Sequence, residues 1–94
     1  MEGVKKDAGK PRWSLIPAGT LLEVVRVLTF GAQKYDDDNW MGVPEARKRY
    51  YDALQRHVEA WWGGEVADPE SGFHHLAHAV CCALFLMWFD RHHG

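Results

Sequence analysis

The strongest constraint on the fold is the apolar run from Ala79 to Phe89, in which no residue carries a charge. A helix that is hydrophobic all round must be covered by protein on every side. The run has about half of the ~20 residues needed to cross a bilayer, so it predicts a core helix and no membrane partner. One short chain supplies few other helices to cover it. We therefore expect this last helix to be shared across a homo-oligomer.

The size and charge of the chain restrict its class. Its 94 residues suit a single domain, and its formal net charge of −2 comes without the basic stripe of a nucleic-acid-binding protein. We therefore expect no nucleic-acid partner. Cys81 and Cys82 are adjacent, so a bridge between them would be strained. Together with an N-terminus that has no signal-peptide core, they predict a cytoplasmic protein with reduced thiols.

Turn and cap signals divide the chain into three helices and an N-terminal strap. Pro17 precedes Thr20 and Glu23, which have capping-box spacing. A glycine pair at 63–64 ends the second helix, and Asp68 is expected as the N-cap of the third. We predict an all-α, three-helix hairpin or bundle in a single domain (1–94), with helices at approximately 18–34, 44–62 and 69–91 and a mobile arm (1–9) leading into an extended strap.

The junction between the second and third helices contains more chemistry than a turn requires. His74 and His75 flank His78 on one broad helix face. Taken singly, each histidine is read as a hydrogen-bonded core residue, and Asp68 and Glu70 as an N-cap and a favourable charge at a helix N-terminus. The spacing fits no zincin or structural zinc pattern. Taken together, the residues favour a functional site made of His57, Glu65, Asp68, Glu70, His74, His75 and His78.

The strap carries a cation pair beside an aromatic ring. Prolines at 11 and 17 favour an extended backbone that presents Lys10 and Arg12 next to Trp13. This combination suits a phosphate and a base. The alternative is that Trp13, Leu15 and Ile16 pack on the helices while the two cations are solvated.

The loop after the first helix combines aromatic, amide and acidic side chains. Tyr35 and Trp40 are suited to stack on a purine, with Asn39 reading its edge and Lys34 on its phosphates. The acids at 36–38 repel one another in a packed core, so they face solvent, a divalent cation or both.

Six motifs spread along the chain occur in a recognisable order. They are Gly9-Lys10-Pro11-Arg12-Trp13, the stretch Val27 to Tyr35 with Asn39-Trp40, Arg56-His57, Gly64-Glu65, Asp68 to Gly72, and His75 to Ala79. From about Gly9 to Leu86 the chain thereby resembles the phage proteins of the dATP/dGTP diphosphohydrolase N-terminal domain family. The resemblance implies removal of pyrophosphate from a purine deoxynucleoside triphosphate in the host cytoplasm. It also implies a relationship to MazG-type pyrophosphohydrolases, which are all-helical, metal-dependent and usually oligomeric.

One part of the chain departs from the MazG pattern. Those enzymes hold Mg²⁺ with acidic motifs on two successive helices, whereas this chain has His57 and Glu59 on the second helix and His75 and His78 on the third. Histidine suits Mn²⁺ or zinc better than Mg²⁺, which prefers oxygen. The departure affects catalysis more than nucleotide binding.

Three functions remain open at this stage: a pyrophosphohydrolase, a phage sponge that sequesters a nucleotide or a nucleotide second messenger against host defence, and a structural helical oligomer. For the enzyme we expect a small-molecule nucleotide partner and Mg²⁺ or Mn²⁺ as the cofactor. The catalytic candidates are Glu70, His75 and His78, and the metal ligands Glu65, Asp68, Glu70 and His78. The nucleotide-binding candidates are Lys10, Arg12, Trp13, Lys34, Tyr35, Asn39, Trp40 and His57.

Overall fold

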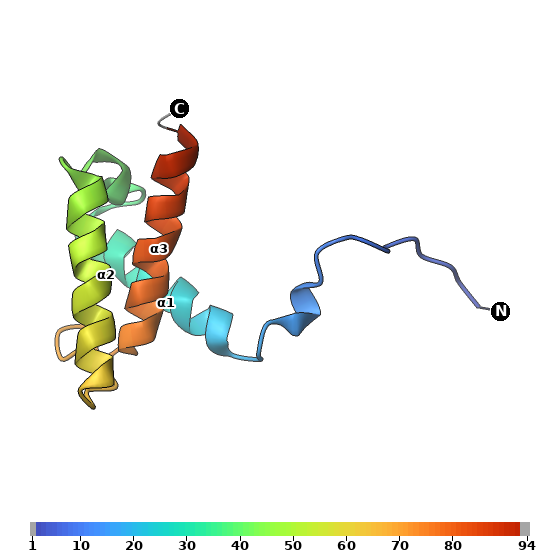
Figure 1. Cartoon of the computed structure of the whole chain (residues 1–94), viewed down its shortest axis with the longest axis horizontal. Coiled ribbons are helices and arrows are strands. Elements are labelled where there is room, and N and C mark those ends of the chain that lie inside the picture. The colour runs from blue at the N-terminus through green and yellow to red at the C-terminus, as the bar shows by residue number, and fades with distance from the viewer. Residues whose placement is uncertain (1, 93–94) are drawn as a thin grey trace.

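The computed structural model describes residues 2–92, so that Met1, His93 and Gly94 lie outside the described residues. The described part confirms the all-α prediction. It contains the three α-helices α1 (Thr20–Tyr35), α2 (Ala46–Trp62) and α3 (His75–His92) and two short 3-10 helices, η1 (Trp13–Leu15) and η2 (Asn39–Gly42) (Figure 1).

Helices α2 and α3 form an antiparallel hairpin, and α1 crosses behind them (Figure 1). The small core lies where α1 meets α3. Val24 and Val27 of α1 pack on Ala77 and Cys81 of α3. No large side chain among residues 2–92 is fully buried, and α3 keeps exposed apolar residues although two helices cover it. No helix in this range is both long and apolar enough to span a membrane.

One expected helix start and one expected cap are wrong. Helix α1 begins after Gly19, whose φ of 85° a glycine adopts without strain. The Thr20 hydroxyl donates to the carbonyl of Pro17 at 2.7 Å and forms no capping box with Glu23. Helix α3 begins at His75 rather than near residue 69, because backbone hydrogen bonds between Asp68 and Phe73 and between Val66 and His75 hold the preceding segment in a turn.

The N-terminal segment leaves α1 and projects away from the three helices (Figure 1). Trp13 is 74% exposed and Leu15 is 67% exposed. The alternative in which Trp13 and Leu15 pack on the helices is therefore not what a single chain shows.

Candidate functional site

The C-terminus of α2 is stopped by a glycine motif that directs the chain back toward α3. Gly64 has a φ of 105° and donates its N–H to Trp61, while the N–H of Glu65 reaches the carbonyl of Ala60 at 3.0 Å. These two bonds form a Schellman motif, which requires a left-handed residue at this position. The predicted glycine stop is confirmed, and it fixes the position of Glu65.

Residues 66–74 form a hydrogen-bonded turn around Asp68. The backbone of Asp68 pairs with that of Phe73, and His75 donates its N–H to the carbonyl of Val66 at 2.8 Å. The Asp68 carboxylate accepts the N–H of Glu70 at 2.7 Å. Asp68 therefore caps a tight turn instead of a helix, and its second carboxylate oxygen faces α2 and α3.

Three side chains from three segments converge beside this turn. His57 on α2, Asp68 in the turn and His78 on α3 each offer a ligand atom, and the three atoms lie within 4.8 Å of one another. Asp68 Oδ2 is 3.7 Å from His57 Nδ1 and 4.0 Å from His78 Nε2. Within residues 2–92 this is the one such group of three, so the acids at 36–38 do not converge in this way.

A chain of hydrogen bonds orients His57 within this triangle. The buried His75 ring donates from Nε2 to Glu65 Oε1 at 2.6 Å, and its Nδ1 lies 2.8 Å from His57 Nδ1. A neutral imidazole has one donor and one acceptor nitrogen. His75 therefore accepts from His57 Nδ1–H, and this leaves Nε2 of His57 unprotonated.

The other histidine of the triangle is held by stacking and by a hydroxyl. The rings of His57 and His78 are parallel within 7°, with centroids 4.6 Å apart. Ser71 Oγ lies 2.6 Å from His78 Nε2, the nitrogen that faces Asp68. A ligand at this nitrogen would take the place of the hydroxyl.

The environment favours neutral histidines beside an ionised carboxylate. Burial lowers the pKa of His57 and of His78, although the charge of Asp68 acts in the opposite direction. Burial by itself would raise the pKa of Asp68, but the hydrogen bond from the Glu70 N–H and the neighbouring His78 lower it overall. At neutral pH the triangle therefore offers two neutral imidazoles and one carboxylate, all of which can donate electron pairs.

The triangle lies at one side of an open groove of about 1120 Å³ formed by α1, the loop after it, α2 and α3. The groove contains three cations, Lys34, Arg49 and Arg56. Lys34 is paired with Glu70 across the groove, and this bond raises the pKa of Lys34. Tyr35 and Asn39 are exposed at its wall.

The structure divides the predicted metal and catalytic residues into two groups. Asp68 and His78 join the triangle, whereas Glu65 contacts His75 and Glu70 contacts Lys34. His75 has both ring nitrogens engaged, so it supports His57 rather than facing the groove. His74 lies apart from the cluster, where its Nδ1 accepts the N–H of Leu76 at the start of α3.

The predicted nucleotide-binding residues also fall into two groups, one in the groove and one on the N-terminal segment. His57, Lys34, Tyr35, Asn39 and Trp40 all line the groove. One face of the Trp40 ring is stacked on Phe85 with centroids 4.4 Å apart, so Trp40 contributes to packing first.

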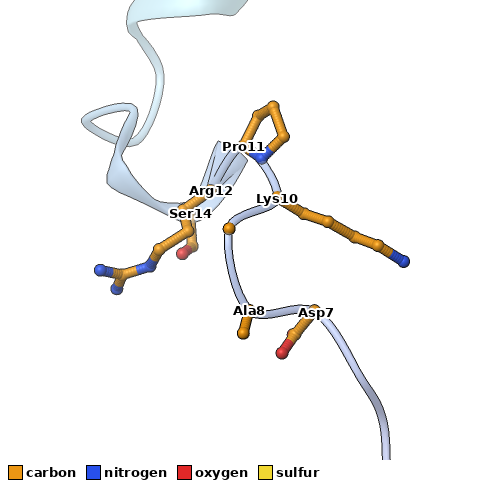
Figure 2. A pocket seen from close by; sticks show the side chains of 7 residues that line it. Asp7, Ala8, Lys10, Pro11, Arg12 and Ser14 are labelled. Carbon is orange, nitrogen blue, oxygen red and sulfur yellow. The ribbon is translucent and has the colours of Figure 1, made fainter.

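The remaining predicted residues lie on the N-terminal segment. Lys10 and Arg12 border a separate open hollow of about 350 Å³ within residues 7–14, where their side chains point away from each other (Figure 2). Trp13 next to them is exposed. The structure of a single chain therefore does not bring these three residues to the groove.

Three groove residues were not predicted from the sequence. Ser71 and Arg56 each lie in a motif of the family resemblance but were given no role there, and Arg49 was only placed outside the apolar face of the second helix. The spacing of seven residues between Arg49 and Arg56, two helical turns, is the signal that places both on one face with Asp52.

Comparison with known proteins agrees with the motifs. The family model described as dATP/dGTP diphosphohydrolase, N-terminal, matches residues 1–94. The chain belongs to this family. A relative in Salmonella phage PMBT28, named dATP/dGTP diphosphohydrolase, is 42% identical over 88 residues, which cover 94% of this chain. The chain spans only 30% of the length of that family member. No solved structure matches.

Proposed function

We propose that this chain binds a purine deoxynucleoside triphosphate in the groove and, with a divalent cation, hydrolyses it to the monophosphate and pyrophosphate. The observation that carries the proposal is the convergence of His57, Asp68 and His78 at the wall of a groove that contains three cations. The family and the name of the phage relative support the substrate class. The proposed setting is the host cytoplasm, whose reducing conditions keep Cys81 and Cys82 as free thiols.

The triangle has the donor set of a transition-metal site. Two imidazoles and one carboxylate bind Mn²⁺, Fe²⁺ or Zn²⁺ more readily than Mg²⁺, which prefers oxygen ligands. Asp68 Oδ2 lies 4.0 Å from His78 Nε2, so small side-chain movements would bring both atoms onto one ion, and His57 would coordinate it through its unprotonated Nε2. His57, Asp68 and His78 would hold the ion. It would polarise a phosphate oxygen and lower the pKa of a bound water.

The residues of the groove supply part of the other requirements. Lys34, Arg49 and Arg56 orient the phosphates and offset part of their charge. Water attacks the α-phosphorus, the bond to the bridging oxygen breaks, and pyrophosphate leaves with that oxygen. Glu70, a carboxylate of the groove outside the triangle, accepts the proton of the water. Glu65, through His75, holds His57 in the required tautomer.

A second candidate is sequestration of a nucleotide or a nucleotide second messenger without turnover. The histidine content of the site favours it, since imidazoles and a serine hydroxyl bind phosphate oxygens without an ion. In this case the groove would bind its ligand tightly and leave it intact. The sponge would act against host defence.

One sample set separates the two candidates. Purified protein is incubated with dGTP, dATP and other nucleotides in Mn²⁺, Mg²⁺ or chelator, and the nucleotides are resolved by chromatography after heat denaturation. We expect monophosphate in excess of protein with Mn²⁺, and loss of turnover in His78→Ala but not in His92→Ala, an exposed histidine outside the cluster. Intact nucleotide recovered only after denaturation would support sequestration. If the protein neither hydrolyses nor binds any of these nucleotides, both candidates are contradicted.

A further inference from the structure

The N-terminal segment, residues 2–17, presents unpaired charge and apolar surface away from its own helices. Within the described residues, neither Lys10 nor Arg12 forms an ion pair or a side-chain hydrogen bond with the helices. Trp13, Leu15 and Ile16 are all exposed beside them. With Lys5, Lys6, Glu2 and Asp7 included, the segment carries a formal charge of +2. Exposure of these apolar side chains to water costs free energy.

The groove has the opposite charge. Its lining contains six carboxylates, Asp36, Asp37, Asp38, Asp52, Asp68 and Glu70, against the three cations, which gives a formal charge of −3. A triphosphate entering this groove would meet net repulsion, even when one divalent ion is bound. The groove therefore requires further positive charge from outside the helices of this chain.

The segment and the groove also match in composition and length. The groove wall formed by α1 begins with the exposed Val25 and ends at the acids of 36–38, a distance of about 15 Å at 1.5 Å per residue. From Lys10 to Leu15 the segment spans a similar ~14 Å, partly extended and partly 3-10 helical. Its apolar side chains can cover the apolar end of the wall while its cations reach the acids.

We propose that the N-terminal segment docks in the groove of a second copy of this chain. Docking within one chain would require the strap to reverse along the full length of α1, from Thr20 to Tyr35, whereas the segment points away from that helix (Figure 1). A second copy requires no such change, and the exposed Leu21, Leu22 and Val25 on α1 add apolar surface for the same contact. If the groove binds a nucleotide as proposed above, Lys10 and Arg12 of one copy contact the phosphates bound by the other copy.

Crosslinking tests the docking without any nucleotide, so its result does not depend on turnover. Arg12→Cys and Asp37→Cys variants are mixed and treated with a short bis-maleimide. The native Cys81 and Cys82 also line the groove, but they are only 3% and 7% exposed, and burial raises their pKa values to about 12 and 11; each variant treated alone measures any reaction with them. Arg12→Cys mixed with Asp90→Cys is the matched control, since Asp90 is exposed on α3 outside the groove.

We expect a covalent heterodimer from the first mixture, at several times the yield of the control mixture or of either variant alone. Equal yields would overturn the proposal. The double variant Arg12→Cys/Asp37→Cys tests whether the segment docks on its own chain, which would also contradict the proposal. If it gives only an internally linked monomer while the mixture gives no dimer, the segment docks on its own chain.

Discussion

The two ends of the α2–α3 hairpin differ in the contacts that join the two helices. At one end, Trp40 and Tyr50 pack against Phe85, and Trp88 lies edge-on to Trp40 with centroids 5.1 Å apart. At the other end, the two helices are joined by the hydrogen-bonded histidines and acids of the junction. Aromatic burial at the first end supplies stability, so the second end can keep desolvated polar groups that cost free energy.

This difference is consistent with His57 and His78 facing a groove instead of a packed core. Each polar group of the junction has a partner, and no buried side-chain nitrogen or oxygen among residues 2–92 lacks one. The partners nevertheless leave one oxygen of Asp68 and one nitrogen of His57 open to a ligand. The two ends therefore make separable predictions, one about folding and the other about chemistry.

The largest effect on folding is expected at the aromatic end. Trp40→Ala removes the stacked ring from Phe85 and should lower the free energy of unfolding by about 3 kcal/mol. Trp62→Ala is the matched control, since that ring is 78% exposed and its loss should change stability by less than about 0.5 kcal/mol. Urea denaturation measures both. Equal effects would show that Trp40 does not anchor this end.

The largest effect on turnover is expected at the junction between α2 and α3. Asp68→Asn keeps the oxygen that accepts the Glu70 N–H but removes the negative charge, so turnover should fall by at least about 100-fold with little change in Tm. Asp90→Asn should leave turnover unchanged. A large drop in the Tm of Asp68→Asn would instead assign this carboxylate a structural role.

A smaller effect is expected for Glu65→Gln, because Glu65 acts on His57 through His75. Turnover with Mn²⁺ should fall by about 10-fold, and the acid limb of its pH profile should shift as the tautomer of His57 is released. Glu59→Gln, which changes an exposed glutamate on α2, is the control. An unchanged pH profile would mean that Glu65 does not position His57.

The smallest effect is the change that pH is expected to cause in the free energy of unfolding of the metal-free protein. The pKa values of His57 and His78 are lowered by folding, so below about 6.5 the unfolded chain binds protons that the folded chain resists. The free energy of unfolding should therefore decrease as pH falls through this range, and the decrease should be smaller in His57→Gln. Urea titrations from pH 7.5 to 5.0 measure it, and stability that rises toward pH 5 would contradict the assigned environment.

The sequence predicted those parts of the fold that depend on local signals. The apolar run from Ala79 to Phe89 identified α3, and the glycine pair at 63–64 identified the end of α2. The start of α3 was predicted too early, because Asp68 and Pro69 are local start signals that the pairing of Asp68 with Phe73 and of Val66 with His75 overrides. Such pairing depends on tertiary structure and leaves no periodic pattern in the sequence.

Sequence spacing predicted which residues gather at this end of the hairpin, but it assigned His57 to the nucleotide and Glu65 and Glu70 to the metal, and it did not predict how these side chains pair. Spacing placed His57, Asp68 and His78 at one end of a helical hairpin, where the structure has them. It did not reveal that Glu65 turns to His75 and Glu70 to Lys34, since side-chain partners across a turn depend on its backbone conformation. Trp40 was expected to stack on a purine as an aromatic residue of the loop after the first helix, whereas one face of its ring packs on Phe85.

The most direct test of the account is where a divalent cation binds. Mn²⁺ broadens the NMR signals of nearby protons, so a substoichiometric titration followed on the imidazole Cε1–H signals locates it. We predict that the signals of His57 and His78 broaden first, while that of His92 at the far end of α3 stays sharp. Uniform broadening, or earlier broadening of the Tyr35 ring beside the acids at 36–38, would contradict a metal site at the junction.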